Sequence, residues 1–330
     1  MLKRLFALAG ALVTLAVGFL AALPYWPLRS SHPEQALVIE QGASLARVAR
    51  EIEARGVAPA WVVRAVARLR GSAARLRSGT YRIEGRRTVG ELLEAIENGE
   101  ALVQRFTLVE GATLIDLVAA LQELARPPVS LRLDGLDRLE QLHAEFSNGT
   151  ASAEGWFFPD TYWLVPGGSA RTLLRTMHER MKQELDRAWQ ARAPDLPLRT
   201  PHEALILASL IEKETGRDAE RPLIASVFIN RLRLGMPLQS DPTVIYGLGA
   251  RFDGNLRKRD LRADTPYNTY VRGGLPPTPI AMPGRASLRA AVAPAETDYL
   301  YFVARGDGTS EFSRSLAEHN RAVARYQLKP

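Results

Sequence analysis

One nearly wholly apolar run, residues 205–216 (LILASLIEKETG), ends abruptly in carboxylates. No charge precedes Glu212 within it, so the run predicts a helix that is buried in the core and leaves it at this residue. Burial against apolar walls disfavours the ionised form of a carboxyl, which can then act as a general acid near neutral pH. The alternative is a helix that simply ends in water, with Glu212 and Glu214 as solvated charges.

Segments rich in amide, hydroxyl and aromatic side chains follow this run. They are residues 227–233 (VFINRLR), 238–247 (LQSDPTVIYG), 265–270 (TPYNTY) and 273–280 (GGLPPTPI). Pro and Gly punctuate most of them, which predicts irregular loops. Amides and carboxylates bind sugar hydroxyls, and aromatic rings bind the apolar faces of sugars, so these loops favour a glycan ligand.

Together with residues 154–162 (EGWFFPDTY), these motifs closely resemble those of the endolytic murein transglycosylase family of bacterial cell-wall enzymes. The resemblance covers nearly the whole chain and is densest from Glu154 to Arg321. It implies a membrane-anchored enzyme that cuts peptidoglycan glycan strands internally, between N-acetylmuramic acid and N-acetylglucosamine, and terminates growing chains. It also places the catalytic role on Glu212.

The residue types that are absent narrow the chemistry to carboxylates. The sequence has no Cys, no H-x-x-x-H pair, no Gly-rich phosphate loop and no G-x-S-x-G elbow, so we expect no metal and no cofactor. An ordinary glycosidase needs two carboxyls. A lytic transglycosylase needs one, because the C6 hydroxyl of the muramic acid attacks its own C1 and leaves a 1,6-anhydro end. Glu212 would then serve as both general acid and general base.

Two other functions stay open at this stage. A hydrolytic muramidase would use water and a second carboxylate, such as Asp241 or Glu214. A non-catalytic scaffold would only bind the cell wall. Nucleic acid is not an expected partner, because the net charge of +7 comes from scattered Arg residues and equally suits anionic lipid and acidic wall polymers.

The remaining predicted site residues are substrate contacts. Ser209 precedes Glu212 by three positions and could orient its carboxyl or bond back to a helix carbonyl. Asp241 could bind sugar or cap the following helix, and the cap is favoured. Tyr246 and Tyr267 could stack on sugar or belong to the core. The candidate hydrogen-bond donors are Asn230, Gln239 and Asn268.

Three more carboxyls lie in or near the motifs. Glu214 points about 200° around the helix from the candidate acid, so we expect a structural residue, paired with Arg217 or Arg221. Glu110 precedes a glycine and is expected to support a turn. Glu154 is expected to support the site without touching substrate.

The N-terminus carries a charge-free stretch, Leu5 to Leu23, behind Lys3 and Arg4. At about 1.5 Å per residue it spans roughly 28 Å, close to a bilayer's hydrocarbon core. The basic pair favours a cytoplasmic N-terminus. We therefore predict a cytoplasmic tail (1–4), a single-pass anchor in the inner membrane (5–23) and a periplasmic remainder, with cell-wall synthases as partners implied by the resemblance. A cleaved signal peptide is the alternative.

The rest of the chain predicts an α+β protein in two parts. Residues 34–105 are expected to form a small LysM-like α+β subdomain, because the order strand, helix, helix, strand fits 37–83 and the family resemblance implies it. Residues 106–330 are expected to form a larger, mixed α+β catalytic domain. Its expected helices lie near 137–145, 170–190, 202–215, 220–234 and 315–326, with a hairpin of 299–304 and 310–312.

Overall fold

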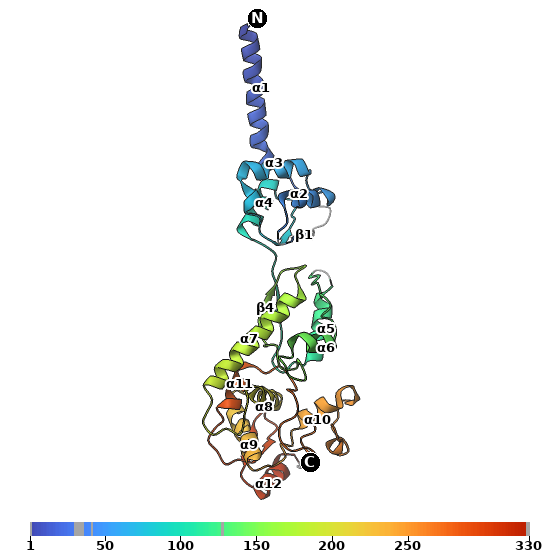
Figure 1. The fold of residues 1–330 in the computed structure, drawn as a ribbon, viewed down its shortest axis with the longest axis vertical. Helices are drawn as coiled ribbons and strands as arrows, with labels where there is room; N and C mark the ends of the chain where they lie inside the picture. The colour runs from blue at the N-terminus through green and yellow to red at the C-terminus, as the bar shows by residue number, and fades with distance from the viewer. Residues whose placement is uncertain (1, 30–35, 41, 127–128, 328–330) are drawn as a thin grey trace. The chain divides into compact units, whose positions relative to one another are not determined.

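The structure is a computed structural model that describes residues 2–29, 36–40, 42–126 and 129–327 (Figure 1). It divides into two compact units. The first holds residues 1–106, 124–132 and 163–168, and the second holds 107–123, 133–162 and 169–330. The predicted division at 105/106 differs, since it assigns 124–132 and 163–168 to the second part. Met1 and residue 34, where two predicted segments begin, lie outside the described residues.

The first unit begins with α1 (Leu2–Ala22) and a short 3₁₀ turn (Leu23–Tyr25). Within the described ranges, no helix is both long enough and apolar enough to cross a membrane. The predicted anchor over 5–23 is therefore not confirmed and stays a prediction.

The body of the first unit follows the predicted order. Its elements are β1 (Ala36–Ile39), α2 (Leu45–Ala54), α3 (Ala60–Arg70), β2 (Gly79–Arg82) and α4 (Val89–Asn98). β1 and β2 pair in antiparallel register, with Leu37 opposite Tyr81, and both side chains are buried in the core of the unit. The order strand, helix, helix, strand is thus confirmed, whereas the likeness to LysM modules stays a prediction.

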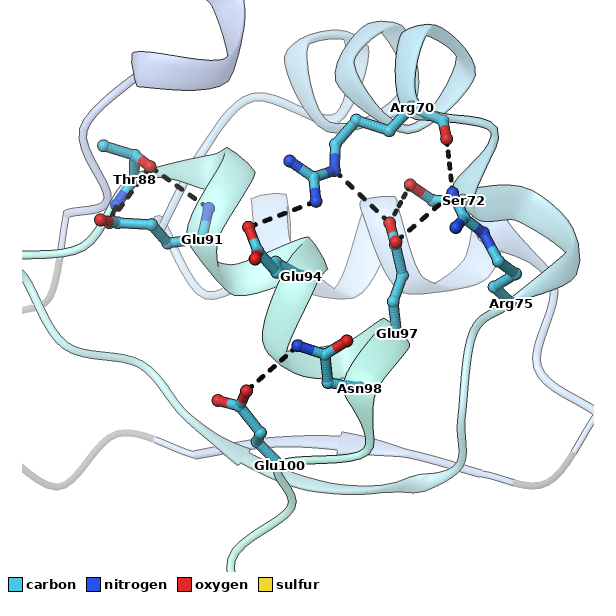
Figure 2. A network of polar contacts seen from close by, with 9 residues as sticks. All are labelled: Arg70, Ser72, Arg75, Thr88, Glu91, Glu94, Glu97, Asn98 and Glu100. Carbon is cyan, nitrogen blue, oxygen red and sulfur yellow. Dashed lines mark hydrogen bonds and ion pairs between the residues drawn. The ribbon is translucent and has the colours of Figure 1, made fainter.

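Polar side chains fix both ends of α4 (Figure 2). Thr88 and Glu91 form a capping box: the Thr88 N–H donates to Glu91 Oε2 (2.7 Å), and the Glu91 N–H donates to Thr88 Oγ1 (3.3 Å). In the last turn, Glu97 Oε1 accepts a hydrogen bond from the Ser72 hydroxyl and lies 3.5 Å from Arg70 Nε. These contacts hold α4 against the C-terminal end of α3.

The second unit is mainly helical. Its elements are α5 (Leu114–Leu124, whose last residue falls in the first unit), α6 (Leu139–Phe146), α7 (Ala170–Gln190), α8 (Pro201–Glu214), α9 (Arg221–Arg233), α10 (Asp241–Leu248), α11 (Arg285–Val292), β5 (Tyr301–Ala304), β6 (Ser310–Ser313) and α12 (Leu316–Tyr326). The boundary between the units falls inside β3 (Gln104–Thr107) and β4 (Thr161–Leu164). The predicted helices and the antiparallel β5–β6 hairpin are confirmed. No helix was expected over α11.

The predicted buried helix, α8, is the centre of this unit. It contacts α7, α9, α10 and α11, and every residue from Ala204 to Ile211 is buried. Thr200 caps its start by accepting the Glu203 N–H (3.2 Å). It ends at Glu214, because Thr215 takes an extended conformation. The apolar run therefore carries its two carboxylates to the edge of the core, as predicted. The α+β class is confirmed.

Candidate functional site

Glu212 lies in the last turn of α8, with only 5% of its side chain exposed. Its Oε1 is 2.9 Å from Arg221 Nη2, and its Oε2 accepts the N–H of Gly284 (2.8 Å). The prediction that apolar groups surround the Glu212 carboxylate is wrong. α8 buries the residues before it, but its two oxygens meet a cation and a backbone donor.

Arg221, the first residue of α9, is fixed as firmly as the carboxylate it faces. Its side chain is 4% exposed. Its Nε donates to Ser287 Oγ on α11 (2.9 Å), and Nη1 pairs with Asp218. The guanidinium therefore joins α8, α9 and α11 at one point, and it holds Glu212 in a single orientation.

A second carboxyl, Glu110, reaches the same guanidinium from a distant part of the sequence. Its Oε2 lies 3.9 Å from Arg221 Nη2, and half of its side chain is exposed. The backbone of Gly111 donates to the carbonyl of Met282 (2.9 Å), which holds this loop in place. Burial raises the pKa of Glu110, the charge of Glu212 raises it further, and Arg221 opposes both effects. The sequence predicted only that Glu110 supports a turn, and it did not indicate the position of this carboxyl beside Arg221.

Gly284 touches both carboxyls. Its N–H donates to Glu212, and its Cα lies so close to Glu110 that a Cβ at this position would overlap Glu110 Oε1. Its φ of −79° is open to any residue, so the close approach is the reason that glycine is needed here. A carboxyl pair, one guanidinium and one backbone N–H thus make up the candidate site.

Ser209 and Asp241 occupy structural positions. Ser209 is fully buried, and its Oγ donates to a carbonyl of its own helix and accepts the N–H of Ile280 (3.0 Å). Asp241 Oδ1 accepts a hydrogen bond from the Tyr270 hydroxyl (2.6 Å). Its favoured role as helix cap is wrong, because Ser240 holds the N-cap position and Asp241 is the first residue of α10. Sugar contacts of either residue stay predictions.

The three predicted amide donors hold loops together. Asn230 Nδ2 donates to the carbonyl of Thr297 (2.8 Å), and Gln239 Oε1 accepts from Arg231 Nη1 (3.1 Å). Asn268 is fully buried and donates to two backbone carbonyls, the nearer at 2.7 Å. Their contacts with substrate stay predictions.

Tyr246 and Tyr267 belong to a second cluster, built around Glu154. The Tyr246 hydroxyl donates to Glu154 Oε2 (2.9 Å), and the Leu114 N–H donates to both Glu154 oxygens (3.0 and 3.1 Å). The two rings pack edge to face, 4.8 Å apart. Burial raises the pKa of Glu154 to about 7. The structure thus shows both rings packed together, and stacking on sugar stays a prediction.

Glu214 makes a different contact from the expected ion pair. The Ser240 hydroxyl donates to its Oε1 (2.5 Å), while Arg221 pairs with Glu212 instead. Burial raises the pKa of Glu214 to about 7. In the part of the chain that the structure describes, no cluster of three or more His, Asp or Glu is placed to hold a metal ion.

Residues 37–325 match the YceG-like family. The chain belongs to this family. It is 34% identical over 264 residues to an endolytic murein transglycosylase of Bacillus subtilis (strain 168), an alignment that covers 76% of this chain and 72% of the relative. It is 28% identical over 282 residues to one of Streptococcus pneumoniae serotype 2 (strain D39), covering 76% of this chain and 51% of that relative.

A solved structure agrees with this assignment. The 2.6 Å crystal structure of the yceG-like protein lmo1499 of Listeria monocytogenes matches with a TM-score of 0.53 and 27% identity. The match covers 88% of this chain and 99% of the other. The family that the sequence motifs predicted is therefore confirmed.

Proposed function

We propose that this YceG-like protein is an endolytic lytic transglycosylase of peptidoglycan, with Glu212 as its general acid and base. It would cut the β-1,4 bond between N-acetylmuramic acid and N-acetylglucosamine inside nascent strands. The names of the curated relatives support the enzyme class. The observation that supports Glu212 is its carboxylate at the end of α8, oriented by Arg221 and Gly284.

In the proposed reaction Glu212 gives up one proton and regains another. The protonated carboxyl gives its proton to the glycosidic oxygen as the bond from C1 to that oxygen breaks. The C6 hydroxyl oxygen of the same muramic acid then bonds to C1, and its proton passes to the carboxylate. A 1,6-anhydro end and a free hydroxyl result. Between these steps the charge on Glu212 is stabilised by the guanidinium and by the backbone N–H.

The proposed setting is the periplasmic face of the inner membrane. The charge-free stretch from Leu5 to Leu23, behind Lys3 and Arg4, supports a single-pass anchor with a cytoplasmic N-terminus. Such an anchor would keep the active site near newly made glycan strands, where cutting terminates their elongation. Cell-wall synthases are the partners that this setting would supply.

Digestion of purified peptidoglycan by the full chain in detergent tests the proposal. Mass spectrometry distinguishes anhydro ends from reducing ends, because the former are lighter by one water. Anhydro ends that disappear with Glu212→Gln are the expected result. Reducing ends would point to a hydrolytic muramidase instead. A folded protein that binds the wall and releases nothing would point to a scaffold.

A further inference from the structure

Glu110 and Glu212 face one another across a single nitrogen atom. Arg221 Nη2 is 2.9 Å from Glu212 Oε1 and 3.9 Å from Glu110 Oε2. Gly284 is a second shared neighbour, since its N–H bonds to one carboxyl and its α-carbon lies against the other. The two carboxyls thus share two neighbours, the Arg221 guanidinium and Gly284.

The charges around this pair oppose the ionisation of both carboxyls at once. Two ionised carboxylates would place two negative charges against one guanidinium. The other charged groups nearby are Asp218, which pairs with Arg221, and Lys213, whose Nζ donates to the carbonyl of the residue after Glu110 (3.2 Å). Asp218 is largely exposed, so solvent screens its charge. Burial and the negative charge of Glu212 raise the pKa of Glu110, and Arg221 opposes both effects.

We propose that Glu110 is a positioning residue that acts through Glu212: its carboxylate lies beside the same guanidinium nitrogen, and its negative charge offsets Arg221 so that Glu212 can carry the proton that the reaction needs. The inference rests on the proposed function. It resolves a difficulty in that function, because Arg221 and the Gly284 N–H both favour the carboxylate form of Glu212, whereas the first step of the reaction needs its acid form. The negative charge of Glu110 opposes this effect.

The first test is the pH profile of kcat/KM on peptidoglycan, with the full chain and its Glu110→Gln variant. The amide removes the negative charge, so Arg221 would hold Glu212 ionised to lower pH. The upper limb of the profile should then move down by about one pH unit, so that the loss of activity grows with pH. Glu110→Asp retains the negative charge, so its pH profile should lie close to that of the unsubstituted protein.

Gly284→Ala moves the Glu110 carboxylate without changing the residue itself. The methyl group would overlap Glu110 Oε1, while the backbone N–H to Glu212 is retained. We expect the same downward shift, smaller than in Glu110→Gln. Gly273→Ala is the matched control, because a Cβ there meets nothing within 4 Å, and its profile should equal that of the unsubstituted protein.

Carboxyl resonances of ¹³C-labelled glutamate provide a readout that needs no turnover. Signals assigned through Glu110→Gln and Glu212→Gln should titrate as a coupled pair in the unsubstituted chain. Coupled signals without any product from peptidoglycan would support the interaction of Glu110 with Glu212 and overturn the proposed function. Product formation with independent titrations, and with a Glu110→Gln profile lowered equally at every pH, would overturn the role of Glu110 alone.

Discussion

The two carboxyl clusters of the second unit differ in the groups that surround each buried carboxyl. Glu154 is enclosed by neutral donors, the Leu114 N–H and the Tyr246 hydroxyl. Glu212 meets the Arg221 cation, and the second carboxyl beside that cation is half exposed. A buried carboxyl with its pKa near 7 is thus not by itself the mark of an active site. A closed cluster among neutral partners suits stability, whereas a charged cluster with an exposed neighbour suits proton exchange.

Removing the cation from the open cluster should have the largest effect on stability. Arg221→Met leaves the buried Glu212 carboxylate without its partner, so the free energy of unfolding should fall by about 3–5 kcal/mol. Urea denaturation of the full chain in detergent measures this change. Arg217→Met, at an exposed position nearby, should change the free energy by only about 0.5 kcal/mol. Equal losses in the two variants would contradict the structural role of Arg221.

In the closed cluster, Gly155→Ala should destabilise by about 2–4 kcal/mol. Gly155 has a φ of +81°, and an added Cβ would lie 2.6 Å from the Pro279 ring. Both the backbone strain and the overlap oppose the alanine. The shift of the urea midpoint measures the loss, with Gly273→Ala as the control. A midpoint within error of that control would show that the segment is not packed as described.

The pH dependence of stability distinguishes a protonated Glu154 from an ionised one. Its pKa is raised from 4.5 to about 7 in the folded protein, so the folded state retains a proton that the unfolded state loses. This contribution to stability is present below pH 4.5 and is lost as the pH rises to about 7, with a total of about 3 kcal/mol. Glu154→Gln should remove that fall, which urea titrations at several pH values would measure. An unchanged fall would assign it to other groups.

Tyr246→Phe should have the smallest effect. It removes one hydrogen bond to Glu154 while the ring keeps its contact with Tyr267, so a loss of about 1 kcal/mol is expected. Because the cluster is structural in this account, the yield of anhydro ends from peptidoglycan should stay the same. A large loss of product with unchanged stability would instead place Tyr246 in contact with substrate.

The sequence predicted those parts of the fold that depend on local pattern. The charge-free stretch before Glu212 predicted a buried α8 and its end. The hairpin of β5 and β6 followed from an apolar run that ends in a Gly-Asp-Gly turn. α11 was missed, because it has only eight residues, and so short an apolar pattern does not by itself distinguish a helix from other structure.

Local sequence pattern could not predict which residues come together at the site. Glu110 is about a hundred residues from Glu212, and only the folded chain brings both to Arg221. Polar loop residues such as Asn230 and Asn268 have side chains suited to sugars, but the same amides bond well to backbone carbonyls, and the structure uses them in this way. Residue type alone does not separate the two uses.

The most direct test of the account compares Glu212→Gln with Glu214→Gln, the same substitution two positions apart on α8. Peptidoglycan digests of both variants would be analysed for anhydro ends, with circular dichroism confirming that each is folded. We expect a loss of about 10²-fold or more for Glu212→Gln and retained product for Glu214→Gln. Anhydro ends formed at the normal rate by folded Glu212→Gln protein would contradict it.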